Sequence, residues 1–162
     1  MHGRLASFFA KELFKTLPAL PPHTVITYVP RRSAAKRGIG YDQAERIARA
    51  LGALCGVPTV KALCRRKDAN GEQKKLRRAQ RILAGKTAYG AGKEIASVKH
   101  AFVLLIDDIL TSGATVASCA AILKENGADA VCALTIAYTN EKTKQIILTT
   151  IEASGKIVSN VL

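Results

Sequence analysis

The chain has 162 residues, enough for one domain with one sizeable core, and its 48% apolar content excludes a disordered protein. Its formal net charge of +13 implies an anionic partner: a polyphosphate metabolite, nucleic acid or an acidic membrane surface. Four widely spaced cysteines without a CxxC pair argue against a zinc ribbon and a disulfide framework, and favour reduced thiols in the cytoplasm. We expect neither a secretory signal nor a membrane span, because every apolar run is short.

The first part of the chain predicts two helices and a strand. Residues 4–17 have their apolar side chains on one face and predict an amphipathic helix. The β-branched stretch 24–29 predicts a strand, and a basic loop at 31–40 follows it. Residues 42–54 predict a helix that Asp42 caps and that Gly56 and Pro58 stop.

The second part continues the alternation of strands and helices. The expected elements are a short strand at 59–64, a mobile loop leading into a polar helix at 65–81, a turn-rich stretch at 85–92, a buried strand at 101–106, a helix at 114–125, a buried strand at 130–137 and a hairpin formed by 145–151 and 156–162. Alternation of this kind predicts an α/β domain with a mostly parallel sheet.

The most informative segment is VLLIDDILTSGAT, residues 103–115. It combines a buried strand, the carboxylates of Asp107 and Asp108, and a loop of small and hydroxyl-bearing residues that opens a helix. Ligands of open α/β sheets bind at the carboxyl ends of strands. Gly113 allows close approach of the backbone, and the amides at the start of the helix favour an anion. A ribose phosphate offers the matching diol and phosphate.

Similar segments occur at other kinds of site, and a neighbouring segment resembles part of a P-loop. A strand that ends in two aspartates is also found in Walker-B-like metal sites, or simply before a helix cap. Gly85-Lys86-Thr87 looks like the end of a P-loop, but Gln80 occupies the position of its first glycine and no strand precedes it. A P-loop NTPase is therefore excluded.

Segment 103–115 resembles the phosphoribosyl pyrophosphate (PRPP) motif of type I phosphoribosyltransferases, and within that group the chain is similar to the ComF family, named for a bacterial competence protein. YVPRRS (28–33), GYDQAERIA (40–48) and RRKDANGEQKKLRRAQR (65–81) match further ComF segments in the same order. The resemblance covers roughly residues 24–138. Many ComF proteins begin with a four-cysteine zinc ribbon, which is missing here, and Ile39 and Ala84 replace a common Arg and Asn.

The resemblance implies a PRPP site, with Mg²⁺ bound alongside PRPP and reaching Asp107 and Asp108 indirectly. The residues expected to hold the ribose and its phosphate are Asp107, Asp108, Leu110, Thr111, Ser112, Gly113, Ala114 and Thr115. Those expected to bind pyrophosphate are Pro30, Arg31, Arg32 and Arg37. Those expected to serve catalysis, at the start of a lid that excludes water, are Arg65, Arg66 and Lys67.

The implied architecture is a type I phosphoribosyltransferase fold, a mostly parallel sheet flanked by helices with a small hood. We expect a single domain, 1–162, with an N-terminal helix or hood at 1–22, a core at 24–138 and a C-terminal hairpin at 139–162. A solvated, charged helix is an alternative interpretation of the basic run 74–78.

Two functions follow. The first is Mg²⁺-dependent transfer of phosphoribosyl to an unknown nitrogen acceptor in nucleotide metabolism. The alternative is a non-catalytic protein that binds PRPP or a nucleotide, or that handles single-stranded DNA in competence. Aromatic residues make up only 5% of the chain, so we expect DNA binding to be weak. The expected ligand is PRPP or a nucleoside monophosphate. We expect no membrane partner, and a homodimer is compatible with both functions.

Overall fold

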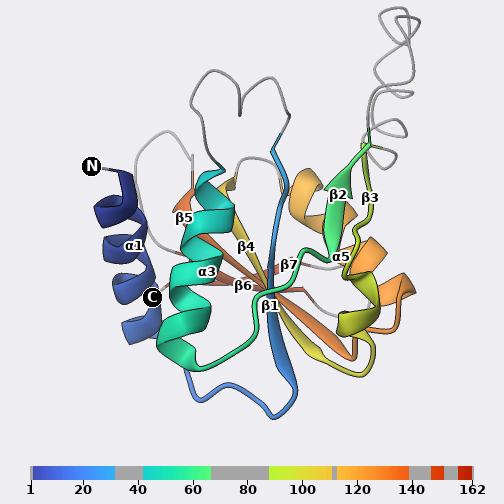
Figure 1. Ribbon diagram of the computed structural model, residues 1–162, viewed down its shortest axis with the longest axis horizontal. Coiled ribbons are helices and arrows are strands. Elements are labelled where there is room, and N and C mark those ends of the chain that lie inside the picture. The colour runs from blue at the N-terminus through green and yellow to red at the C-terminus, as the bar shows by residue number, and fades with distance from the viewer. Residues whose placement is uncertain are drawn as a thin grey trace, which may run out of the picture.

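The computed structural model describes residues 2–31, 42–66, 88–110, 113–138, 147–151 and 157–161 (Figure 1). Its main sheet has five strands in the order β1-β4-β5-β6-β7. The strands are β1 (Thr24–Tyr28), β4 (Phe102–Leu110), β5 (Ala130–Tyr138), β6 (Ile147–Ile151) and β7 (Ile157–Val161). β1, β4 and β5 run parallel, whereas β6 and β7 are antiparallel and extend the sheet beyond β5. The expected α/β domain with a parallel central sheet and a C-terminal strand pair is confirmed.

Helices cover both faces of this sheet. α1 (His2–Thr16) and α3 (Gln43–Cys55) lie on one face, and α5 (Ala114–Glu125) lies on the other (Figure 1). Alternate residues of β4 point to opposite faces, so Leu104 and Ile106 pack with α1 and α3, while Val103 and Leu105 pack with α5. Because β4 is buried on both faces, side chains on both faces are apolar, which explains the continuous apolar run in its sequence.

The start of α3 follows from its sequence. Asp42 adopts an extended conformation (φ −101°, ψ 114°), and its side chain accepts a hydrogen bond from the amide of Glu45. The helix is capped by Gly56, which has a left-handed φ of 66° and whose backbone amide donates a hydrogen bond to the carbonyl oxygen of Gly52. The expected cap and stop are both confirmed.

The short strands differ from expectation. The expected strand at 59–64 is replaced by β2 (Leu63–Arg65), which begins later and ends one residue beyond that stretch. β2 pairs antiparallel with β3 (Tyr89–Ala91), which lies in the stretch expected to be turn-rich. Thr59 pairs with Ile26 of β1 as an isolated β-bridge and is not part of a described strand. Three-residue strands are too short for an alternating pattern, and their pairing depends on a partner distant in sequence. A 3₁₀ helix, Ile95–Val98 (η2), was also not anticipated.

Two bulk expectations can be compared with the described part of the chain. None of its helices is long and apolar enough to cross a membrane. The four cysteines are free thiols: Cys119 and Cys132 are buried, and Cys55 and Cys64 are half-buried.

Candidate functional site

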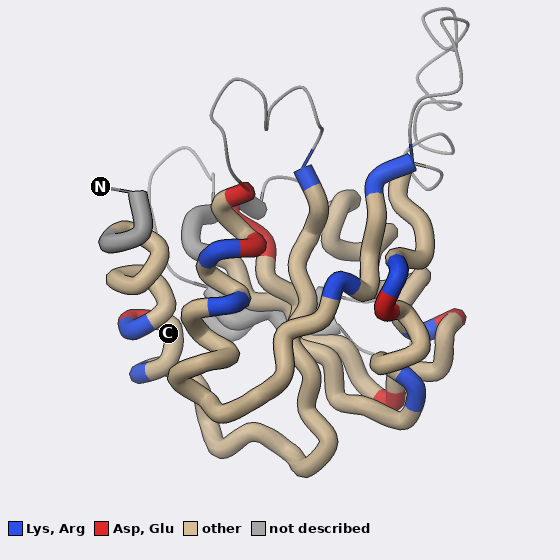
Figure 2. Tube along the Cα trace, in the orientation of Figure 1, with Lys and Arg blue, Asp and Glu red and all other residues tan. Residues whose placement is uncertain are grey.

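The candidate site lies at the carboxyl edge of the parallel strands. Tyr28 of β1 is in register with Ile106 of β4, so the residues that follow each of them meet at one edge of the sheet. Arg31 follows β1, and Asp107 and Asp108 follow Ile106. Figure 2 shows basic residues at this edge, at the upper ends of β1 and β2. Arg31 and the two carboxylates therefore lie at the same edge of the sheet.

The two carboxylates lie within β4 and not beyond it, because the strand continues to Leu110. Asp107 pairs with Thr135 of β5, and Leu110 pairs with Tyr138. We expected the strand to end at residue 106, but its pairing with β5 continues as far as Leu110. Since side chains alternate along a strand, Asp107 lies on the α5 face and Asp108 on the α3 face.

The environments of the two carboxylates differ accordingly. Asp107 is only 6% exposed, and its Oδ1 accepts a hydrogen bond of 2.9 Å from the amide of Asp108. The Asp108 side chain is 18% exposed and forms an ion pair with the guanidinium of Arg31. One carboxylate is thus fixed against the core, and the other is paired with a cation at the edge of the sheet.

Asp42 connects the end of β1 to α3. Its Oδ2 accepts a hydrogen bond of 3.1 Å from the amide of Arg31, and its Oδ1 accepts one of 3.5 Å from the amide of Glu45. Asp42 is only 4% exposed, so water competes little for these bonds. Sequence reasoning identified Asp42 as a helix cap but missed its contact with Arg31, which follows only from the tertiary fold.

The proposed phosphate loop is described in part. Gly113 has φ 72° and ψ −8°, a left-handed conformation that favours glycine, and it precedes α5 without a side chain to cap the helix. The first amides of α5 therefore have no side-chain acceptor at the cap position. Ala114 and Thr115 form the exposed start of α5, and Leu110 is the last residue of β4. Thr111 and Ser112 lie outside the described residues.

Arg65 and Arg66 contact β3. Nη1 of Arg65 donates a hydrogen bond of 2.9 Å to the hydroxyl of Tyr89, and the guanidinium carbon lies 5.0 Å from the centroid of the same ring. The backbone amide of Arg66 donates to Ala88 O at 3.0 Å, and its side chain is exposed. Pro30, at the end of β1, is buried. Lys67, Arg32 and Arg37 lie outside the described residues, as does most of the expected lid.

Arg65 and Asp107 both act on one buried thiol. Burial raises the pKa of Cys119 to about 12, the carboxylate of Asp107 also raises it, and the guanidinium of Arg65 lowers it. Cys119 lies on α5 and is fully buried. Cys119 packs in the same buried cluster as Tyr89, the partner of Arg65, and Leu105, two residues before Asp107. The cation and the carboxylate therefore lie on the α5 side of the sheet.

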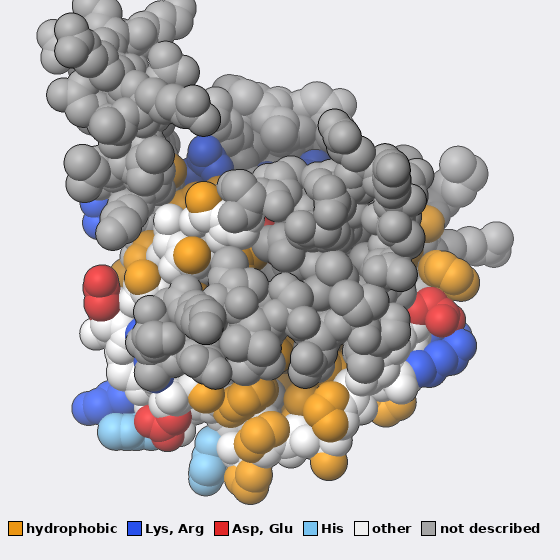
Figure 3. Space-filling model, turned by 180° about the vertical axis from the view of Figure 1, so that it is seen from behind, with side chains coloured by type: hydrophobic (Ala, Val, Ile, Leu, Met, Phe, Trp, Pro, Cys, Tyr) orange, Lys and Arg blue, Asp and Glu red, His pale blue; other side chains and the backbone are white. Residues whose placement is uncertain are grey.

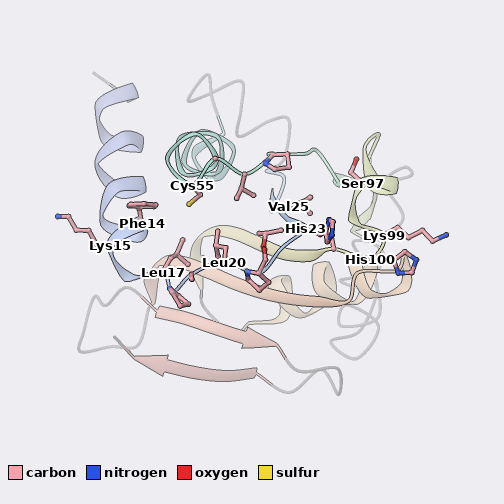
Figure 4. A pocket seen from close by; sticks show the side chains of 18 residues that line it. Phe14, Lys15, Leu17, Leu20, His23, Val25, Cys55, Ser97, Lys99 and His100 are labelled. Atoms are coloured by element: carbon pink, nitrogen blue, oxygen red, sulfur yellow. The ribbon is translucent and has the colours of Figure 1, made fainter.

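A large groove lies at the opposite, amino edge of β1 and β4. It has a volume of about 1070 Å³, and apolar side chains such as Phe14, Leu17 and Val25 line it together with His23 and His100 (Figure 4). Apolar side chains and histidines are also visible along the lower edge in the space-filling view (Figure 3). No pattern in the sequence predicted this groove, and neither Asp107 nor Asp108 lines it.

Comparisons with known proteins agree with the fold. A family model described as "Phosphoribosyl transferase domain" matches residues 39–158, most of the chain. The chain therefore belongs to the phosphoribosyltransferase domain family. No curated protein sequence matches it.

Two solved structures share its type I phosphoribosyltransferase fold. The allosteric regulatory enzyme of purine biosynthesis is 20% identical with a TM-score of 0.54, over 86% of this chain and 27% of that one. Glutamine PRPP amidotransferase from B. subtilis, complexed with ADP and GMP, is 18% identical with a TM-score of 0.53, over 83% of this chain and 25% of that one. The chain thus spans about a quarter of the length of these enzymes.

Proposed function

We propose that this protein is a ComF-like phosphoribosyltransferase that binds PRPP and transfers its phosphoribosyl group to a nitrogen acceptor in nucleotide metabolism. The observation that carries the proposal is the convergence, at one edge of a parallel sheet, of two carboxylates on β4, the start of α5 and Arg31. Membership of the phosphoribosyltransferase domain family supports it. The free thiols support a cytoplasmic location.

In this proposal the ribose lies over the end of β4. Asp107 and Asp108 accept hydrogen bonds from the sugar hydroxyls, and ionised carboxylates form stronger bonds of this kind than neutral acceptors do. The 5-phosphate occupies the loop formed by Leu110, Thr111, Ser112, Gly113, Ala114 and Thr115. The left-handed Gly113 and the uncapped first turn of α5 fit this role, because helix amides bind anions.

The pyrophosphate group lies beside the end of β1, at Pro30, Arg31, Arg32 and Arg37. Arg31 reaches this edge, since its guanidinium already contacts Asp108. Mg²⁺ would arrive with PRPP and neutralise charge on the pyrophosphate. The residues that the structure describes include no cluster of three metal-ligating side chains. In this proposal PRPP therefore supplies most of the ligands of Mg²⁺, and Asp107 and Asp108 interact with the ion indirectly.

During the reaction the bond between the anomeric carbon and a pyrophosphate oxygen breaks, and a bond from that carbon to the acceptor nitrogen forms. The bonding electrons leave with pyrophosphate, and the acceptor nitrogen releases its proton to the departing pyrophosphate or to solvent. Negative charge therefore grows on the departing oxygens, where fixed cations lower the barrier. Arg65, Arg66 and Lys67 are the cations that we assign to this step, together with the exclusion of water.

A second candidate function is non-catalytic: binding of PRPP or a nucleotide, or handling of single-stranded DNA in competence. The formal charge of +13 favours keeping it, because one pyrophosphate site uses only part of this charge. A phosphoribosyltransferase and a non-catalytic PRPP-binding protein both need the PRPP site, whereas a DNA-handling protein does not. Binding of PRPP therefore separates DNA handling from the other two.

Isothermal titration calorimetry with PRPP, with and without Mg²⁺, tests the proposal. We expect binding that Mg²⁺ strengthens and that Asp107→Asn with Asp108→Asn abolishes, while circular dichroism shows a folded protein. Asp129→Asn is a matched control, because Asp129 is exposed beside His100 at the amino edge of the sheet. Unchanged PRPP affinity in the folded double variant would show that the site is elsewhere.

A further inference from the structure

Tyr89 is a buried aromatic side chain directly opposite Arg65. The two residues are partners in the antiparallel register of β2 and β3. Tyr89 is only 8% exposed, and its ring packs in the core that β4 and β5 share with α5. The ring is therefore held by the same residues that position β4, and it forms a fixed surface beneath a flexible arginine.

Tyr89 holds the Arg65 guanidinium in two ways. Its hydroxyl accepts the 2.9 Å hydrogen bond from Nη1, and its ring lies 5.0 Å from the guanidinium carbon, within the range of a cation–π contact. An arginine side chain loses much rotational freedom when it binds an anion. A partner that already restricts the guanidinium lowers that cost, so the cation is pre-organised for its ligand.

The neighbouring glycine suits a second arginine. A Cβ atom at Gly90 would lie 2.9 Å from Nε of Arg66, closer than Cβ atoms pack. The Arg66 side chain therefore lies against β3 where no side chain intervenes. Two adjacent arginines thus lie against β3: Arg65 against Tyr89, and Arg66 against Gly90.

Most N–H groups of the Arg65 guanidinium donate to no side chain among the described residues. A guanidinium has five N–H groups, and among the residues that the structure describes only Tyr89 accepts a side-chain hydrogen bond from Arg65. The Tyr89 ring that contacts the guanidinium packs in the same buried cluster as Leu105 and Cys119, so Arg65 lies on the α5 side of the sheet, as Asp107 does. We therefore expect Arg65 to contact an anion that binds beside Asp107.

We propose that Tyr89 is a positioning residue that directs the Arg65 guanidinium to the pyrophosphate group of PRPP. This inference rests on the proposed function, because it assumes that PRPP occupies the carboxyl edge of β4. It adds a residue that the PRPP motif does not contain. Tyr89 touches Arg65 and not the ligand, so it acts only through Arg65.

The experiment compares two ligands that differ in one group. Binding of PRPP with Mg²⁺ and of ribose 5-phosphate is measured by calorimetry, or by competition where ribose 5-phosphate is weak. Tyr89→Phe keeps the ring and removes only the hydroxyl. It should weaken PRPP binding about threefold to tenfold, the effect of one hydrogen bond, and leave ribose 5-phosphate binding unchanged.

Arg65→Ala supplies the control that a purely structural role would not satisfy. In an Arg65→Ala background, Tyr89→Phe should cause no further loss of PRPP affinity, because the hydroxyl then has no guanidinium to position. A loss that persists in this background, or an equal loss for both ligands, would overturn the positioning role while the PRPP site stands. Failure of the unmodified protein to bind PRPP would instead overturn the proposed function, and this inference with it.

Discussion

Arg31 and Asp108 form an ion pair across the boundary between β1 and β4, with the Arg31 side chain 31% exposed and the Asp108 side chain 18% exposed. In the proposed function these residues bind different parts of PRPP, the pyrophosphate and the ribose. Each is thus the other's partner before a ligand arrives. Binding of PRPP requires both to exchange this contact for contacts with the ligand.

The first prediction concerns this exchange. Asp108→Asn should weaken ribose 5-phosphate binding but leave inorganic pyrophosphate binding equal or tighter by up to about fivefold, because a partly exposed ion pair contributes at most about 1 kcal/mol. Calorimetry with the two ligands measures the difference. Arg31→Ala should show the reverse preference. Parallel losses of both ligands in Asp108→Asn would contradict the division of roles.

The second prediction concerns Asp42. Asp42→Ala removes the acceptor of two amides and should lower the free energy of unfolding by about 0.5–2 kcal/mol, the usual effect of losing a helix cap. It should also weaken pyrophosphate binding, because Arg31 loses the bond that fixes its backbone. Urea denaturation and calorimetry measure the two effects. Asp42→Asn retains one acceptor oxygen and should fall between the unmodified protein and Asp42→Ala; a pyrophosphate affinity unchanged in both variants would refute the link.

The third prediction concerns Cys119. Its buried thiol, with a pKa raised to about 12, should resist alkylation at pH 8, whereas the half-buried Cys55 and Cys64 react first. Mass spectrometry after timed labelling identifies the modified residues. The raised folded-state pKa stabilises the protein below the unfolded value of 9.0, and this contribution is lost as the pH rises toward 12. The loss of stability over that range should be smaller in Cys119→Ala.

The fourth prediction concerns DNA. If the basic residues serve PRPP, single-stranded DNA should bind at about 10⁻⁴ M, the weak end of the non-specific range, and its binding should weaken as salt rises. Fluorescence titration with a labelled oligonucleotide at two salt concentrations measures this, with PRPP as competitor. Micromolar or tighter binding that PRPP does not displace would favour the competence function. Displacement by PRPP would place both anions in one site.

Local patterns predicted the elements that depend on local interactions. The cap at Asp42 and the stop at Gly56 lie next to the helix they bound, and the buried strands β4 and β5 are continuous apolar runs. The length of β4 was underestimated, because the carboxylates interrupt its apolar pattern while β5 still pairs with its backbone. The β2–β3 pair was missed for a related reason: neither strand is recognisable without the other.

The candidate site divides in the same way. The carboxylates and the start of α5 are adjacent in sequence, so a motif was sufficient to predict them. The contacts of Arg31 with Asp42 and Asp108, and of Arg65 with Tyr89, join residues brought together by β-sheet pairing and helix packing. The amino-edge groove combines α1, the loop before β1 and the residues before β4, and no local pattern reports such a surface.

The placement of Asp107 and Asp108 on opposite faces of β4 gives the two acids different sensitivities to ionic strength. Dissolved ions screen partly exposed charges far more than buried ones, and at about 0.15 M salt the screening length is about 8 Å. Added salt should therefore loosen the contact of Asp108 with Arg31 but hardly affect Asp107, which the core shields. The salt content of the surroundings thus becomes a way to adjust one half of the site while the other half stays as it is.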